Sequence, residues 1–376
     1  MLIGVPRETA IGETRVAVTP ETAKKLAAQG HSLRVESGAG VAASATDDAY
    51  RAVGAEIADR AATFASDLVL KVRSPDAGEL TLMKPGTHLV GMLNPFDRAG
   101  LDALAAAGLT SFALEAAPRT TRAQSMDVLS SQANIAGYKA VMVAADTYQR
   151  FFPMLMTAAG TVKAARVVVL GVGVAGLQAI ATAKRLGAVI EASDVRPSVK
   201  EQVESLGAKF IEVPYETAEE KEAAEGTGGY ARAMPASWLD RQKVEVAKRV
   251  ALADVVISTA LIPGRAAPVL VTEEMVRSMK PGSVIVDLAA GKGPDGHGGN
   301  CPLSVADRTV VVHGVTLIGE TNLASKVGAD ASSLYARNVL DFLKLVLPKE
   351  GGLVVPMDDD IVVACLMTQG GVVKRQ

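Results

Sequence analysis

Short apolar blocks alternate with segments of helical period along the first third of the chain. Thr19, Pro20 and Gly30 mark the start and the end of one such helix, since they are typical of an N-cap, a first helical residue and a C-terminal stop. Strands that alternate with helices are typical of a parallel sheet covered by helices. The pattern predicts strands at 2–5, 33–36, 67–72, 87–93 and 110–114, and a second helix at 98–107.

The same alternation resumes between residues 160 and 320, flanked by two long helical patterns at 130–151 and 329–345. The sequence therefore predicts an α/β protein with two Rossmann-like, doubly wound parallel-sheet domains and a cleft between them. We expect a discontinuous first domain, residues 1–130 plus 326–376, and a second domain of residues 131–325. Strands are expected in the second domain at 167–170, 189–192, 209–211, 255–258, 283–287 and 316–319, and a short strand region at 351–373.

A glycine-rich turn follows the first strand of the second domain. Gly171, Gly173 and Gly176 form a GxGxxG motif between that strand and a helical segment, and Asp194 ends the next strand eighteen residues later. Gly171 permits the tight turn, Gly173 lets a pyrophosphate approach the backbone, and Gly176 allows close packing of helix on strand. This order is the fingerprint of a dinucleotide-binding site, with the pyrophosphate at the helix N-terminus.

The residues around the motif favour NAD(H) over NADP(H). A carboxylate at Asp194 accepts hydrogen bonds from a ribose and repels a 2′-phosphate. Arg196 is the counter-argument, because an arginine can accommodate that phosphate; we expect it instead to pair with Asp194 or to pack on the adenine. Val174, Ala175 and Val195 are expected to line the same nucleotide site.

The segment 214–241 interrupts the alternation with a charged run and a glycine-rich stretch. A segment of this kind inside a compact domain is either a disordered surface loop or a functional one. In the functional interpretation it is a mobile loop of about residues 214–241 that covers the nucleotide, with Tyr230 and Met234 as its apolar contacts.

A second polar constellation lies at the predicted junction of the domains. Gln124, Asp127 and Ser130 follow one another at steps of three, which places them on one face of a helical turn. With Arg119 they offer groups suited to a nicotinamide carboxamide and its ribose. The alternative is a solvated helix start in which Asp127 pairs with Arg119 or Arg122.

The bulk composition excludes several classes. The chain of 376 residues is 49% hydrophobic and 21% charged, and 39 Lys and Arg against 41 Asp and Glu give a net charge of -2, which makes no electrostatic case for nucleic acid. Two cysteines, Cys301 and Cys365, have no metal-type spacing and fit a reducing compartment. The longest charge-free run, 167–183, contains the motif glycines, so no membrane span is expected.

The strings RAQSMDVLSSQ (122–132), GVGVAGLQAIATAKR (171–185), SDVR (193–196), TALIPG (259–264) and GGNCPL (298–303) resemble the NAD(H)-binding domain I of the alpha subunit in the proton-translocating (Re/Si-specific) NAD(P) transhydrogenase family. The resemblance implies that Arg119, Gln124, Asp127 and Ser130 lie at the nicotinamide and that a mobile loop carrying Tyr230 closes over the nucleotide. Ala260, Leu261 and Asn322 are expected at the same site.

The resemblance also implies partners. These are membrane-spanning transhydrogenase subunits that carry the proton path, a separate domain that binds NADP(H), and a second copy of the chain in a homodimer. The chain resembles the split form, in which domain I is its own polypeptide. It is therefore expected to be cytoplasmic and attached peripherally to the inner membrane through those subunits, with activity only in their presence.

Alanine dehydrogenase, a relative with the same fold, is the alternative. Arg15 and Lys71 match its substrate-binding arginine and lysine. An amino-acid dehydrogenase also needs a positioned acid or base. Its histidine should fall near Asn94 and its aspartate shortly after Asp287, but no histidine is there and Asp295 is displaced into a glycine-rich insertion. Arg15 and Lys71 are then expected to pair with local carboxylates.

Overall fold

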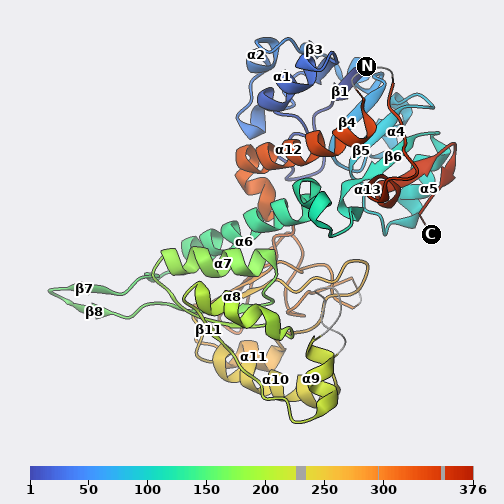
Figure 1. The fold of residues 1–376 in the computed structure, drawn as a ribbon. Helices are drawn as coiled ribbons and strands as arrows, with labels where there is room; N and C mark the ends of the chain where they lie inside the picture. Colours follow the sequence, from blue (N-terminus) through green and yellow to red (C-terminus); the bar gives the residue numbers. More distant parts are fainter. Residues whose placement is uncertain (226–233, 295, 349–351, 376) are drawn as a thin grey trace. The chain divides into compact units, whose positions relative to one another are not determined.

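The computed structural model describes residues 1–225, 234–294, 296–348 and 352–375. The chain divides into two compact units (Figure 1). The first consists of Met1–Gln132 together with Ala324–Gln376, and the second of Ala133–Leu323. The C-terminal part of the chain thus returns to the unit that the N-terminal part begins.

The first unit is built on an eight-stranded sheet in the order β17-β16-β6-β5-β4-β1-β2-β3. The strands of the N-terminal part pair in parallel, whereas β16 pairs antiparallel with β6 and β17 pairs antiparallel with β16. Parallel strands are buried on both faces, which explains their continuous apolar runs. The strands are β1 (Leu2–Val5), β2 (Ser32–Glu36), β3 (Glu56–Ala58), β4 (Leu68–Arg73), β5 (His88–Met92), β6 (Thr110–Ala113), β16 (Leu366–Gln369) and β17 (Val372–Val373).

Helix α12 (Gly328–Val346) packs its apolar side into the core of this unit. Tyr335 and Phe342 are fully buried, and the Phe342 ring lies 5.5 Å from that of Phe112 on β6. The C-terminal segment therefore completes the core of the first unit. The remaining helices of this unit are α1 (Pro20–Ala28), α2 (Asp47–Arg51), α3 (Arg60–Phe64), α4 (Ala77–Leu82), α5 (Arg98–Ala106) and α13 (Asp360–Cys365), and α6 (Val128–Thr147) begins here and continues into the second unit.

The second unit contains a seven-stranded sheet in the order β11-β10-β9-β12-β13-β15-β14. Only β14 runs antiparallel among these strands. If the six parallel strands are numbered in chain order, they stand in the order 3-2-1-4-5-6 across the sheet. This order defines the dinucleotide-binding doubly wound fold and places its topological switch point between β9 and β12. These strands are β9 (Arg166–Leu170), β10 (Val189–Ser193), β11 (Lys209–Phe210), β12 (Val255–Ser258), β13 (Val284–Asp287), β14 (Thr309–Val312) and β15 (Val315–Ile318).

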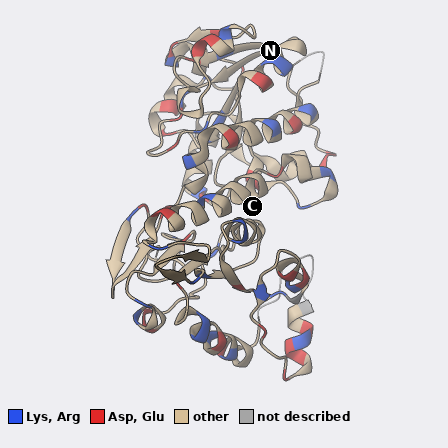
Figure 2. Cartoon of the chain, turned by 90° about the vertical axis from the view of Figure 1, so that its left-hand side faces the viewer, with Lys and Arg blue, Asp and Glu red and all other residues tan. Residues whose placement is uncertain are grey.

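The helices of the second unit cover this sheet, and their charged residues of both signs are interspersed (Figure 2). They are α7 (Val174–Arg185), α8 (Lys200–Ser205), α9 (Ala218–Glu225), α10 (Ala236–Val250) and α11 (Glu273–Ser278). A separate hairpin, β7 (Leu155–Thr157) and β8 (Gly160–Val162), extends away from the sheet of its unit (Figure 1). No helix in the described parts of the chain is both long enough and apolar enough to cross a membrane.

Two segments contain helices where the sequence predicted none. Within 214–241, the charged run forms α9, and α10 begins at Ala236. Glu220 holds these helices together, because its carboxylate accepts hydrogen bonds from Ser237 Oγ at 3.0 Å and Arg241 Nη2 at 2.8 Å. In the tail, α13 forms where only strands were expected, since Asp359 caps the N–H groups of Ile361 and Val362.

Candidate functional site

The glycine turn after β9 has a different requirement at each of its three glycines. Gly171 has φ +89°, a conformation that side chains strongly disfavour. A Cβ on Gly176 would lie 2.0 Å from the carbonyl oxygen of Gly171, so α7 packs directly on the turn. A Cβ on Gly173 would meet nothing within 4 Å. Gly171 and Gly176 are therefore needed for the fold, whereas Gly173 leaves open space beside the backbone.

Helix α7 begins at that open space. Gly173 is its N-cap, Val174 and Ala175 form its first turn, and the Val174 side chain is 40% exposed. The N–H groups of a first helical turn have no partner within the helix and carry the positive end of its dipole. An accessible N-terminus of this kind suits the phosphates of a nucleotide.

Asp194, at the end of β10, holds the turn in place. Its carboxylate accepts hydrogen bonds from Val172 N at 2.7 Å and Arg196 N at 2.9 Å, and it pairs with the Arg196 guanidinium at 3.0 Å. Arg196 also donates to the carbonyl of Val172 at 3.0 Å. The expected pairing of Arg196 with Asp194 is confirmed. These bonds occupy the carboxylate, so a ribose hydroxyl would have to share it with Arg196.

The loop after β12 lies against the glycine turn. Thr259 Oγ1 donates to the carbonyl oxygen of Gly171 at 2.7 Å. Ala260 follows, and the side chains of Leu261 and Ile262 are about half exposed. The carboxyl ends of β9 and β12 meet at the switch point, where ligands of such sheets bind. The second unit thus brings together the turn, Asp194 and the loop that carries Ala260 and Leu261.

The other expected nucleotide contacts lie further from the turn in sequence. Asn322 follows β15 and is half-buried. Val195 packs on a small apolar cluster that contains Met234 and Trp238, so Met234 is a buried core residue here. Tyr230 lies outside the described residues.

The polar constellation of the first unit lies at a helix start. Residues Thr121–Met126 form a 3₁₀ helix, and Asp127 caps α6 by accepting hydrogen bonds from Ser130 N at 2.8 Å and Ser130 Oγ at 2.6 Å. Gln124 and Arg119 are exposed. Arg122 pairs with Asp359 at 2.7 Å and also with Asp360, so the suggested pairing of Arg122 with Asp127 is not observed.

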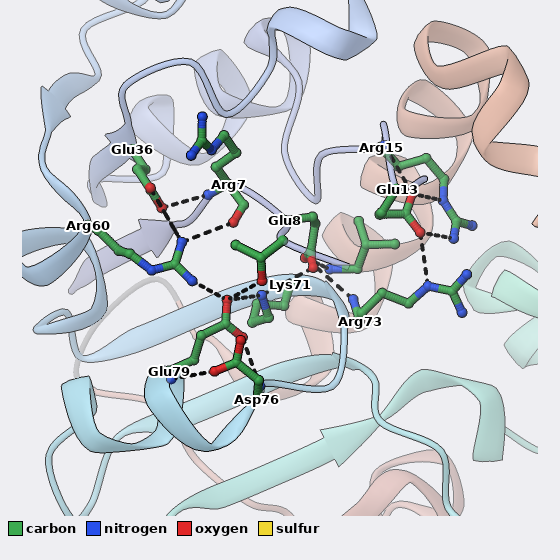
Figure 3. Close-up of polar contacts among 12 residues, drawn as sticks. Arg7, Glu8, Glu13, Arg15, Glu36, Arg60, Lys71, Arg73, Asp76 and Glu79 are labelled. Carbon is green, nitrogen blue, oxygen red and sulfur yellow. Dashed lines mark hydrogen bonds and ion pairs between the residues drawn. The ribbon is translucent and has the colours of Figure 1, made fainter. Parts of the chain in front are cut away.

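Arg15 and Lys71 belong to a buried ionic cluster in the first unit (Figure 3). Lys71, 1% exposed, lies 3.1 Å from carboxylate oxygens of both Glu8 and Glu79. Arg15 pairs with Glu13 at 2.7 Å and donates to Gln132 Oε1 at 2.8 Å. The expected pairing of Arg15 and Lys71 with local carboxylates is confirmed.

The pKa values of Glu8 and Glu13 in this cluster shift in opposite directions. Burial raises the pKa of Glu8 above its ordinary value, and the charge of Lys71 offsets the shift only in part. Burial also acts on Glu13, but its hydrogen bonds and charge interaction with Arg15 outweigh burial and lower its pKa to about 2. Glu13 is therefore held ionised, whereas Glu8 takes up a proton more readily than an exposed glutamate.

The strand order and the glycine turn of the second unit define a dinucleotide-binding α/β protein. Residues missed in the sequence are Asn300 and Asp287, which support the loop after β12. The GGNCPL string at 298–303 was the signal for Asn300, whereas Asp287 was noted only as a reference point for the aspartate of alanine dehydrogenase.

Comparison with known proteins gives the family. The N-terminal domain of alanine dehydrogenase/PNT matches residues 4–136, and the C-terminal domain of alanine dehydrogenase/PNT matches residues 140–376. The chain therefore belongs to the alanine dehydrogenase/PNT family.

Three relatives illustrate where the chain lies in that family. It is 50% identical over 382 residues to an NAD(P) transhydrogenase subunit alpha polypeptide of Rhodospirillum rubrum, covering 99% of this chain and 97% of that protein. It is 32% identical over 300 residues to alanine dehydrogenase of Bacillus subtilis, covering 78% and 71%. The crystal structure of transhydrogenase from Sinorhizobium meliloti superimposes with a TM-score of 0.85 at 44% identity, covering 99% and 98%. The resemblance to transhydrogenase and the two-domain Rossmann-like fold are confirmed.

Proposed function

We propose that this chain is the NAD(H)-binding component of a proton-translocating NAD(P) transhydrogenase. The observation that carries the proposal is the open backbone at Gly173, on an accessible helix N-terminus at the switch point of the sheet. The 50% identity with a transhydrogenase alpha subunit over nearly the whole chain supports the choice within the family. We take residues 131–325 as the NAD(H) domain, and residues 1–130 plus 326–376 as the other.

The residues present fit a dinucleotide. The N–H groups of Val174 and Ala175 would hold the pyrophosphate, and Gly173 leaves it room. Asp194, shared with Arg196, would bind the adenosine ribose and favour NAD(H). Val195, Ala260, Leu261, Asn322 and Tyr230 are proposed to complete the site.

When bound, NAD(H) would supply the hydride chemistry, with NADP(H) on a partner domain as the other reactant. The protein contributes orientation and exclusion of water, and neither requires a proton donor at the reacting carbons. Gln124 is exposed, and its side-chain amide offers both a hydrogen-bond donor and an acceptor, which suits the carboxamide of the nicotinamide. Asp127 and Ser130 form a preorganised carboxylate–hydroxyl pair suited to ribose hydroxyls, and Arg119 is proposed beside them.

The second candidate is an amino-acid dehydrogenase, which the 32% identity with alanine dehydrogenase favours. In this structure the two side chains expected to bind the substrate already have carboxylate partners. Lys71 contacts Glu8 and Glu79, and Arg15 contacts Glu13. Asn94 stands where that enzyme's histidine is expected. We therefore place this function second.

One experiment separates the two candidates. The purified chain, mixed with an NADP(H)-binding domain, is expected to transfer hydride from NADH to thio-NADP⁺, and the chain alone is expected not to reduce NAD⁺ with alanine. Gln124→Ala should lower the transfer rate by about tenfold or more while NADH affinity changes little, since one orienting hydrogen bond is lost. Rapid alanine oxidation by the chain alone, or no transfer by a folded pair, would overturn the proposal.

We further propose that the chain forms a homodimer through the β7–β8 hairpin and docks on membrane-spanning subunits. A two-stranded hairpin is only marginally stable by itself. Two of its apolar side chains are exposed, Met156 by 75% and Val162 by 38%, which suits packing against a second copy.

A charge on the hairpin should therefore weaken the dimer. Met156→Asp is expected to raise the dimer dissociation constant by about tenfold or more, because a buried unpaired carboxylate is costly. Sedimentation at several protein concentrations measures this change. Val311→Asp, at a side chain 69% exposed on β14, is the matched control and should remain dimeric. A dimer unaffected by Met156→Asp rules out the hairpin as the interface.

A further inference from the structure

Asn300 is completely buried behind the loop that follows β12. Its side-chain oxygen accepts a hydrogen bond from Ala260 N at 3.0 Å, and its amide nitrogen donates to Ala260 O at 2.9 Å and Pro268 O at 2.8 Å. One side chain thus pairs with both backbone groups of Ala260, as a neighbouring strand would. These hydrogen bonds fix the backbone of an irregular loop in the way that strand pairing fixes the backbone of a sheet.

Asp287, the last residue of β13, holds Asn300 in turn. Its carboxylate is fully buried and accepts hydrogen bonds from Asn300 N at 3.3 Å and Cys301 N at 2.9 Å. Ser304 Oγ donates to the same carboxylate at 2.6 Å. A Cβ on Gly299 would lie 2.5 Å from an Asp287 oxygen, so only glycine lets the chain wrap this closely. The segment around Asn300 is therefore built around the buried side chain of Asp287.

The same loop is joined to the glycine turn on its other side. Thr259 Oγ1 donates to Gly171 O, and a Cβ on Gly171 would lie 3.0 Å from Ala260 N. The turn follows β9 and the loop follows β12, on the two sides of the switch point. A ligand that lies in the crevice at this point contacts both. The exposed Leu261 and Ile262 extend from the backbone that Asn300 fixes.

We propose that Asn300 is a positioning residue for nucleotide binding, which holds the Ala260–Leu261 backbone where the bound dinucleotide contacts it. Asp287 keeps Asn300 in the required orientation. The proposal rests on the proposed function, since it takes the glycine turn as the NAD(H) site. It adds a residue that does not itself touch the ligand. Supporting side chains of this kind fix a site within a fraction of an ångström.

The test compares Asn300→Ala with Ser304→Ala in the full-length chain. Ser304→Ala removes a hydrogen-bond donor from the same buried Asp287 but leaves the bonds of Asn300 to the Ala260 loop in place. It therefore controls for the lower stability of the chain without disturbing the position of that loop. NADH dissociation constants are measured by titration calorimetry well below the melting temperature of each variant. We expect Asn300→Ala to raise the NADH Kd by about tenfold and Ser304→Ala by less than about twofold.

Thr259→Val is the second variant if Asn300→Ala does not fold. It is close in shape, removes only the hydroxyl bond to Gly171, and should also weaken NADH binding. An unchanged Kd in folded Asn300→Ala, or in Thr259→Val where Asn300→Ala does not fold, overturns the inference, as does equal weakening by Ser304→Ala. Failure of the unmodified chain to bind NADH overturns the proposed function instead.

Discussion

Gly173→Ala should fold almost normally and bind NADH at least about tenfold more weakly than the unmodified chain. The added Cβ meets no protein atom within 4 Å, and Gly173 has φ -82°, which alanine adopts without strain. Its loss as an N-cap costs at most about 1 kcal/mol. The methyl group does, however, occupy the space where the pyrophosphate would approach the α7 N-terminus.

Gly176→Ala is the matched comparison, and it should lower the stability of the fold as well as the affinity for NADH. Its Cβ would lie 2.0 Å from Gly171 O, so α7 must move away from the turn. Overpacking of this sort costs about 1–3 kcal/mol, and both stability and binding should fall. Thermal unfolding and NADH titration on both variants provide the test. A Gly173→Ala variant with unchanged affinity would show that the phosphates bind elsewhere.

Lys71→Met should destabilise the chain by about 3–5 kcal/mol at pH 7. The methionine has a similar volume, but Glu8 and Glu79 lose a buried cation that lies 3.1 Å from each. Glu79 keeps Arg60 at 2.6 Å, whereas Glu8 keeps only backbone donors such as Val72 N at 2.5 Å among its described hydrogen bonds. The penalty should therefore fall mainly on Glu8.

The pH dependence of this variant identifies the group. Glu8 has a raised pKa in the folded state, so the folded chain binds the proton of Glu8 more tightly than the unfolded chain does. The cost of ionising Glu8 in the folded chain is therefore fully present above that raised pKa and absent below pH 4.5, the ordinary value. Without Lys71 this cost grows, and lowering the pH from 7 to 5 should recover part of the stability. Glu13 does not interfere, because its pKa of about 2 means that its contribution is lost only below 4.5.

Urea unfolding at pH 7 and pH 5 measures both effects. Glu8→Gln in the Lys71→Met background is the control, since it removes the unpaired charge and should restore stability at pH 7. A loss below about 1 kcal/mol in Lys71→Met would mean that the cluster is solvated despite its burial.

The glycine motif and the paired cations could be anticipated from the sequence, because each depends on local spacing or on the need of a buried charge for a counter-charge. Helix α9 could not, since its charged run resembles a solvated loop until Glu220 is seen to join α10 through Ser237 and Arg241. Helix α13 was missed for a similar reason, as its cap at Asp359 is further fixed by Arg122 from a distant segment. The contacts of Glu220 with α10 and of Arg122 with Asp359 both join residues that lie far apart in the sequence.

The sequence by itself determined the nucleotide-binding unit of this protein, because glycine conformation, strand hydrophobicity and helix polarity act over a few neighbouring residues. Only the tertiary structure decided that Asp194 shares its carboxylate with Arg196, that Lys71 is enclosed by Glu8 and Glu79, and that Asn300 fixes the backbone of Ala260. Asn300 and Ala260 are forty residues apart, and such hydrogen bonds depend on where separate strands end in space. The hydrophobic periodicity of the sequence does not specify where those strands end relative to one another.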